Sequence, residues 1–195
     1  MERVAQIARC RPAAIILREK DLPEKNYAVL AKQALTVCRQ YGILCILHNF
    51  TAIAAELNAS ALHLPLPVLR SLSAADRKNF SVLGASCHSV AEAEEAESLG
   101  CTYITAGHIF ATDCKKGVPE RGINFLQAVC SAVSIPVYAI GGITPERKSE
   151  LQNAGAEGAC VMSAVMTCSD VGAYFAAWSA LKIGAKKERE SLPAG

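Results

Sequence analysis

Residues 103–117 read Tyr-Ile-Thr-Ala-Gly-His-Ile-Phe-Ala-Thr-Asp-Cys-Lys-Lys-Gly. The apolar start, rich in β-formers, predicts a strand buried on both faces, as in a parallel sheet. The run breaks at Gly107 and places His108 where the strand should end, before a polar and basic loop. An imidazole at the carboxyl end of a buried strand suggests a proton-transfer site. The alternative is a histidine that is satisfied by a backbone carbonyl in a turn.

Short apolar runs, typical of buried strands, alternate with helical patterns on both sides of this stretch. Ser89 and Glu92 have the spacing of a capping box, and Gly100 is a natural end for the helix that they open. Besides the strand before His108, the predicted strands are Ala13–Lys20, Ile43–Leu47, Ala61–Leu64, Ser81–Ser86, Ile135–Ile140 and Ala159–Met162.

Uninterrupted alternation with short connections is typical of parallel βαβ units and predicts an α/β fold of the TIM (β/α)8-barrel type. Such a barrel has eight strands, whereas about seven are visible, with a helix (Glu2–Ala8) before the first of them. The first strand of the barrel is therefore predicted to be lacking. We expect a single barrel domain over residues 1–185 and a frayed tail over 186–195.

Composition excludes several classes of protein. The chain has 195 residues, of which 51% are hydrophobic, and a net charge of +2, which is too mild to indicate a nucleic-acid partner. No apolar run approaches the roughly 18 residues of a membrane span, and the charged amino terminus does not resemble a signal peptide. Nine scattered cysteines without C-x-x-C spacing indicate reduced thiols, and so a cytoplasmic protein.

Residues at the predicted strand ends are candidates for binding an anion. Arg18 and Lys20 are two apart and so share a face of their strand, although an ordinary charged strand end would look the same. In such barrels the loops after the last two strands commonly hold a phosphate on backbone N–H groups. Here those loops are 139–143, which contains Gly141 and Gly142, and 161–164, which ends in Ser163 and Ala164. Small residues there let the backbone approach an anion closely.

These segments, taken together, resemble the thiamine phosphate synthase and TenI superfamily of (β/α)8 barrels. The matching segments follow the family order over nearly the whole chain, and they are 17–20, 62–64, 84–88, 107–115, 139–143 and 161–164.

The resemblance also bears on the branch of the superfamily. The synthases join a pyrimidine diphosphate to a thiazole phosphate, and they hold Mg²⁺ with an aspartate of an Asn-Asp pair and another of a Gln-Glu-Asp stretch. Here the corresponding segments read Asn49-Phe50 and Leu66-Pro67-Val68, so both carboxylates are absent. Mg²⁺ requires oxygen ligands, which phenylalanine and valine do not offer. We therefore expect no metal and no cofactor.

The family stretch Gly-Pro-Ile-Phe-x-Thr-x-Thr-Lys appears here with His108 in place of the proline and Cys114 in place of the second threonine. This form is similar to TenI, the thiazole tautomerase, in which the matching histidine transfers the proton. The resemblance implies an isomerase of thiamine biosynthesis that aromatises a carboxythiazole phosphate, with His108 as its catalytic residue. Lys115 is a further candidate for the anionic groups of the substrate, and Asn49 and Ser86 are candidates for the polar wall of the site.

Two alternatives remain open. One is thiamine phosphate synthase activity itself, and the other is a non-catalytic, phosphate-binding or regulatory barrel. In each case the expected partner is a small phosphorylated thiazole, with neither nucleic acid nor a membrane. Whether the chain forms a homo-oligomer is left open.

Overall fold

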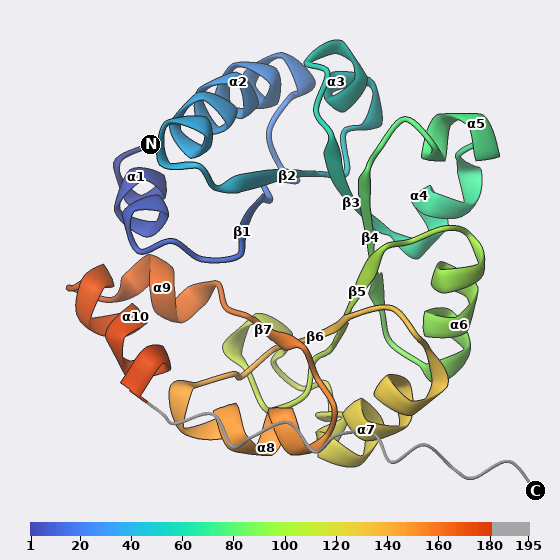
Figure 1. Ribbon diagram of the computed structural model, residues 1–195, viewed down its shortest axis with the longest axis vertical. Helices are drawn as coiled ribbons and strands as arrows, with labels where there is room; N and C mark the ends of the chain where they lie inside the picture. Colours follow the sequence, from blue (N-terminus) through green and yellow to red (C-terminus); the bar gives the residue numbers. More distant parts are fainter. Residues whose placement is uncertain (181–195) are drawn as a thin grey trace, which may run out of the picture.

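The computed structural model describes residues 1–180, which form one curled sheet surrounded by helices (Figure 1). All the strands are parallel. They are β1 (Ala14–Leu17), β2 (Leu44–His48), β3 (Ala61–Pro65), β4 (Val82–Cys87), β5 (Tyr103–Gly107), β6 (Val137–Ile140) and β7 (Gly158–Cys160).

Each strand pairs with the next along the chain, in the order β1-β2-β3-β4-β5-β6-β7. Within the described residues β7 does not pair with β1, so the sheet curls around without closing (Figure 1). This confirms the expected α/β barrel of seven strands with one strand position lacking. We call the opening between β1 and β7 the seam.

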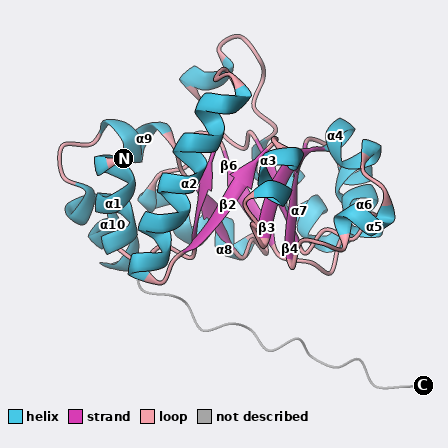
Figure 2. Cartoon of the chain, turned by 90° about the horizontal axis from the view of Figure 1, so that it is seen from above, coloured by secondary structure: helices cyan, strands magenta, loops and turns pink. Residues whose placement is uncertain are grey.

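Helices cover the outer face of the sheet (Figures 1 and 2). The longer helices are α1 (Glu2–Arg9), α2 (Glu24–Tyr41), α6 (Val90–Ser98), α7 (Gly122–Ala132) and α10 (Val171–Ala180). The shorter ones are α3 (Thr51–Glu56), α4 (Leu66–Ser71), α5 (Ala74–Arg77), α8 (Lys148–Asn153), α9 (Ser163–Thr167) and the 3-10 turns η1 (Asp113–Lys115) and η2 (Pro145–Arg147). Ser89 caps α6 as predicted, since its Oγ accepts the N–H of Glu92 at 3.1 Å, but the Glu92 carboxylate accepts the N–H of His88 and not that of Ser89 as in a complete capping box. The predicted frayed tail, 186–195, lies outside the described residues.

Alternation along the strands divides the apolar side chains into two layers. Outward-facing residues such as Leu47, Leu62 and Ile104 are fully buried between the sheet and the helices. Inward-facing residues form a second, smaller cluster, which consists of Ala14, Ile16, Leu44, Ile46, Ala61, Val82, Tyr103 and Tyr138. The interior of the barrel is therefore a packed core and not a channel.

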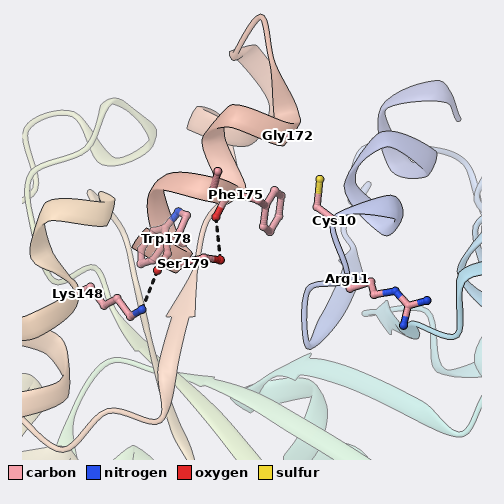
Figure 3. A pocket seen from close by; sticks show the side chains of 8 residues that line it. Cys10, Arg11, Lys148, Gly172, Phe175, Trp178 and Ser179 are labelled. Atoms are coloured by element: carbon pink, nitrogen blue, oxygen red, sulfur yellow. Dashed lines mark hydrogen bonds between the residues drawn. The ribbon is translucent and has the colours of Figure 1, made fainter. Parts of the chain in front are cut away.

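The seam is bridged by helices. Ile7 of α1 packs with Val165 of α9 and Val171 of α10, and the Arg3 guanidinium donates to Cys168 O at 3.1 Å. A pocket of about 590 Å³ lies beside this contact. Figure 3 shows Cys10 and Arg11 on one side of it and residues of α10 on the other. The residues lining the pocket are Cys10, Arg11, Lys148, Gly172, Phe175, Ala176, Trp178 and Ser179.

Among residues 1–180, no helix has the length and apolar character needed to cross a membrane. All nine cysteines lie in the described part of the chain and are free thiols, of which only Cys114 is exposed.

Candidate functional site

The candidate residues gather at one rim of the barrel, because parallel strands that pair side by side end at the same edge of the sheet. Arg18 and Lys20 follow β1, and Asn49 follows β2. Ser86 is the second-last residue of β4. His108, the Gly141–Gly142 pair and the Ser163–Ala164 pair follow β5, β6 and β7. The sequence thus placed each of them at the correct end of its strand.

His108 is 7% exposed and is tied into the loop that follows it. Its Nε2 lies 3.3 Å from Val118 O, and its own carbonyl accepts the N–H of Arg121 at 3.1 Å. The loop is closed by Glu120, whose carboxylate accepts the N–H of Ala111 at 2.6 Å. One nitrogen of this imidazole therefore meets a backbone carbonyl, which is the arrangement that the turn alternative describes.

The Gly141–Gly142 pair packs directly against the loop after β5. Gly141 has φ +94° and Gly142 has φ +64°, a region that side chains disfavour. A Cβ on Gly141 would lie 2.3 Å from the Cβ of His108. The backbones are also joined, since the N–H of Phe110 donates to Gly141 O at 3.0 Å. Only glycine permits this approach.

The loop after β7 meets the same loop from the other side. Cys114 Sγ of η1 lies 3.2 Å from Ser163 Oγ, which belongs to the first residue of α9. The loop after β5 therefore contacts both the loop after β6 and the loop after β7. Lys115 follows Cys114 and is exposed.

Inside the barrel, the structure places a polar cluster that the sequence analysis did not assemble. His63 is 3% exposed, its Nδ1 lies 2.8 Å from Tyr103 Oη, and its Nε2 lies 2.9 Å from Ser86 Oγ. Thr105 Oγ1 lies 3.4 Å from Ser86 Oγ. Both nitrogens of His63 are thus engaged. Burial lowers the pKa of His63 to about 3, with a smaller contribution from His48, so the ring is neutral at pH 7.

A second buried imidazole, His48, lies beside His63 in register on the neighbouring strand β2. Its ring is 7% exposed and stacks on His63 with centroids 5.9 Å apart. Burial first, and the positive charge of Arg18 second, lower the pKa of His48 to about 4. The positive charge of Arg18 is therefore part of the electrostatic environment of His48. Two buried atoms here, His48 Nδ1 and Asn49 Oδ1, have no hydrogen-bond partner among residues 1–180.

Tyr27 of α2 fixes this corner of the rim. Its hydroxyl donates to Leu17 O at 3.1 Å and accepts the N–H of His48 at 3.0 Å, so a single side chain ties the ends of β1 and β2 together. The side chain is fully buried, and burial raises its pKa to about 12.

Replacing Tyr27 with phenylalanine should lower the free energy of unfolding by about 2 kcal/mol, because two buried backbone groups would lose their partner. Urea unfolding of the variant and of the wild type measures the difference. Tyr41→Phe is a matched control, since within residues 1–180 the Tyr41 hydroxyl bonds only the exposed Arg9 side chain, and it should change stability by less than about 0.5 kcal/mol. Equal losses in the two variants would show that Tyr27 does not act through these backbone bonds.

The residues at the positions of the family's magnesium ligands do not fit a metal ion. The Phe50 ring packs on Tyr27 with centroids 4.2 Å apart, Leu66 is 3% exposed, and Val68 packs against the core. None of them offers an oxygen ligand from its side chain. Within residues 1–180, no cluster of three or more His, Cys, Asp or Glu side chains could hold a metal.

His63 is the main residue that the sequence analysis missed. A signal existed, because His63 and Thr105 interrupt otherwise apolar strands, and strand alternation places both on the inner face. Their meeting with Tyr103 and Ser86 depends on sheet pairing over three strands, which a single sequence does not contain.

The fold and the rim define a parallel β/α barrel with small-residue loops after its last two strands, an architecture in which such loops commonly hold a phosphate. Comparison with known proteins makes this specific. The chain belongs to the thiamine monophosphate synthase family, which it matches over residues 1–165.

Relatives and solved structures agree with this family. The chain is 32% identical over 177 residues to the thiamine-phosphate synthase of Syntrophomonas wolfei, which covers 88% of this chain and 83% of the relative. It is 38% identical to the Moorella thermoacetica thiamine-phosphate synthase, with 82% and 77% covered. A structure of thiamine phosphate pyrophosphorylase from Pyrococcus furiosus superimposes with a TM-score of 0.79 at 29% identity, over 91% and 86% of the two chains. A 3-hexulose-6-phosphate synthase, with a TM-score of 0.69 at 16% identity, shares the fold.

The comparisons correct the main functional expectation. Relatives that are 32–38% identical over most of the chain are named thiamine-phosphate synthase, and so the expectation of a TenI-type thiazole tautomerase is wrong. The predicted membership in the thiamine phosphate synthase and TenI superfamily is confirmed, but the predicted TenI branch is not. That choice depended on a histidine in one loop and on two absent carboxylates, whereas the similarity over the rest of the chain favours the synthases.

Proposed function

We propose that the chain acts as a thiamine-phosphate synthase, joining a pyrimidine diphosphate to a thiazole phosphate. The observation that carries the proposal is the similarity to synthases of that name over more than four fifths of the chain. The rim offers cations after β1 and small-residue loops after β6 and β7, which supports a site for two anionic groups, the diphosphate and the thiazole phosphate. We also keep, as a proposal, the extent of the barrel domain at residues 1–185.

In this reaction the carbon–oxygen bond to the diphosphate breaks, and the lone pair of the thiazole nitrogen forms the new carbon–nitrogen bond. The diphosphate leaves with the electron pair of the broken bond, so there is no net oxidation. We assign Arg18, Lys20 and Lys115 to the anionic groups, and Asn49 and Ser86 to the polar wall.

The phosphate of the thiazole is assigned to the loops after β6 and β7, on Gly141, Gly142, Ser163 and Ala164. Gly141 and Gly142 leave no Cβ between the backbone and the loop after β5, and the loop after β7 reaches the same loop through Ser163. We assign His108 a positioning role, because its Cα and Cβ lie against Gly141 and its Nε2 lies 3.3 Å from Val118 O.

The test is a condensation assay on the purified chain with both substrates, in which thiamine phosphate and released pyrophosphate are measured together. We expect both products in equal amounts, and a loss of about 10²-fold or more in kcat/KM for Arg18→Gln. An inactive wild type that is folded by circular dichroism would contradict the proposal.

A second candidate is favoured by the two positions that hold Phe50 and Val68 in place of carboxylates. A barrel that binds a phosphorylated thiazole without condensing it would need the loops after β6 and β7 but not a site for the leaving group. Thiazole phosphate would then raise the melting temperature of the protein, while the condensation assay gave no product.

A further inference from the structure

We propose that the rim of this barrel binds the diphosphate group through its own cationic side chains, Arg18 foremost, and without a divalent metal ion. The inference rests on the proposed function, which supplies the diphosphate as the ligand. It deepens that function by naming what neutralises the charge of the ligand.

No carboxylate faces the site from the described strands. None of the seven strands contains an aspartate or a glutamate, so the inner wall of the described barrel carries no acidic group. The titratable groups that do face inward include His48 and His63, which are neutral at pH 7. A magnesium ion that bridges a diphosphate to a protein normally uses one or two carboxylates for the protein side.

The acidic residues in the rim loops are engaged elsewhere or dispersed. Glu120 is engaged by the N–H of Ala111, and Asp113 lies 3.7 Å from Lys116. Glu19 and Asp21 alternate with the two cations after β1. Within residues 1–180, no three His, Cys, Asp or Glu side chains are grouped so that they could hold a metal ion. The carboxylates therefore do not form a set at the mouth of the barrel.

The three cationic side chains assigned to the anionic groups are exposed and unpaired within residues 1–180. Arg18, Lys20 and Lys115 are exposed, and none of them makes an ion pair within residues 1–180. Arg18 is the first residue after β1 and lies two positions after Ile16, which belongs to the inner cluster. Its guanidinium thus has no ion-pair partner among residues 1–180, and it has the fork geometry that binds phosphate oxygens in pairs.

Titration calorimetry with inorganic pyrophosphate tests the inference without the need for turnover. Binding is measured once in EDTA and once in millimolar Mg²⁺. We expect binding in EDTA that is at least as tight as in Mg²⁺, and that weakens as ionic strength rises. Binding that appears only with Mg²⁺ would overturn the inference, and so would an absence of binding under both conditions.

Variants then identify the groups. Arg18→Gln should weaken pyrophosphate binding in EDTA by about tenfold, as expected for the loss of one charge-assisted contact. Arg39→Gln is the matched control, since it removes the same charge from the exposed far end of α2 and should change the dissociation constant by less than about twofold. Equal effects of the two variants would assign the binding to net charge and would refute the site.

The outcome is separable from that of the proposed function. Metal-free pyrophosphate binding together with an inactive condensation assay would refute the synthase proposal and leave the anion site standing. A product that forms in Mg²⁺ but not in EDTA, with binding that follows the same pattern, would support the synthase and refute the inference.

Discussion

Lowering the pH from about 7 to about 5 is expected to reduce the free energy of unfolding by about 4 kcal/mol. The reason is the pair of stacked imidazoles inside the barrel, His48 and His63. Their pKa values in the folded protein are about 4 and about 3, whereas an unfolded histidine titrates near 6.5.

The direction follows from proton linkage. Below about pH 6.5 the unfolded chain takes up protons on both rings, while the folded chain keeps them neutral until the pH approaches 4. The unfolded state therefore gains protons that the folded state excludes, and the free energy of unfolding decreases as the pH is lowered from about 6.5 to about 4. Each histidine contributes about 2 kcal/mol by about pH 5. The carboxylates of Glu95, Glu97 and Glu146, whose pKa values are lowered mainly by side-chain hydrogen bonds, lose their contributions only below about pH 4.5.

Urea unfolding at the two pH values measures the effect. His48→Phe removes one of the two groups, and the loss of stability between about pH 7 and about pH 5 should shrink to about 2 kcal/mol. His88→Phe is the control, because His88 is exposed, and it should leave the loss nearly unchanged. A wild type that is equally stable at the two pH values would contradict the burial of neutral rings.

Replacing Gly142 with alanine should destabilise the protein by about 3 kcal/mol. The position has φ +64°, and an added Cβ would lie 2.5 Å from Ala111 O and 2.7 Å from Phe110 O. Both of those atoms belong to the backbone, which cannot give way as a flexible side chain would. The loops after β5 and β6 would have to separate, and phosphate binding at this rim should be lost as well.

Gly117→Ala provides the matched control. Gly117 has φ +76°, but an added Cβ there would meet nothing within 4 Å, so only the backbone strain of about 1 kcal/mol is expected. The difference between the two variants in urea unfolding isolates the steric contact. A loss for Gly142→Ala no larger than for Gly117→Ala would show that the two loops are not packed together at this point.

Much of the fold could be predicted from the sequence, because the strands are short apolar runs with clear ends. The start of α6 followed from Ser89 and Glu92, and the lacking strand followed from counting. These features depend on neighbours along the chain. The contact of His63 with Tyr103 could not be predicted in this way, since it depends on three strands pairing in a particular register.

The candidate site shows the same limit. Placement at the strand ends was predictable for Arg18, Gly141 and Ser163, because strand direction alone decides it. The partners of each side chain were not, and the backbone carbonyl that meets His108 Nε2 belongs to a residue ten positions further on. The roles of these residues stay predictions until the variants are measured.

A closed barrel holds its circumference through an unbroken ring of hydrogen bonds. Within residues 1–180 this sheet has two unpaired edges, so its diameter at the seam is set by side-chain packing between α1 and the helices α9 and α10. Arg18 follows one of the two edge strands, and the Ser163 loop follows the other. The distance between Arg18 and the Ser163 loop therefore depends on the packing of helices and not on hydrogen bonds of the sheet.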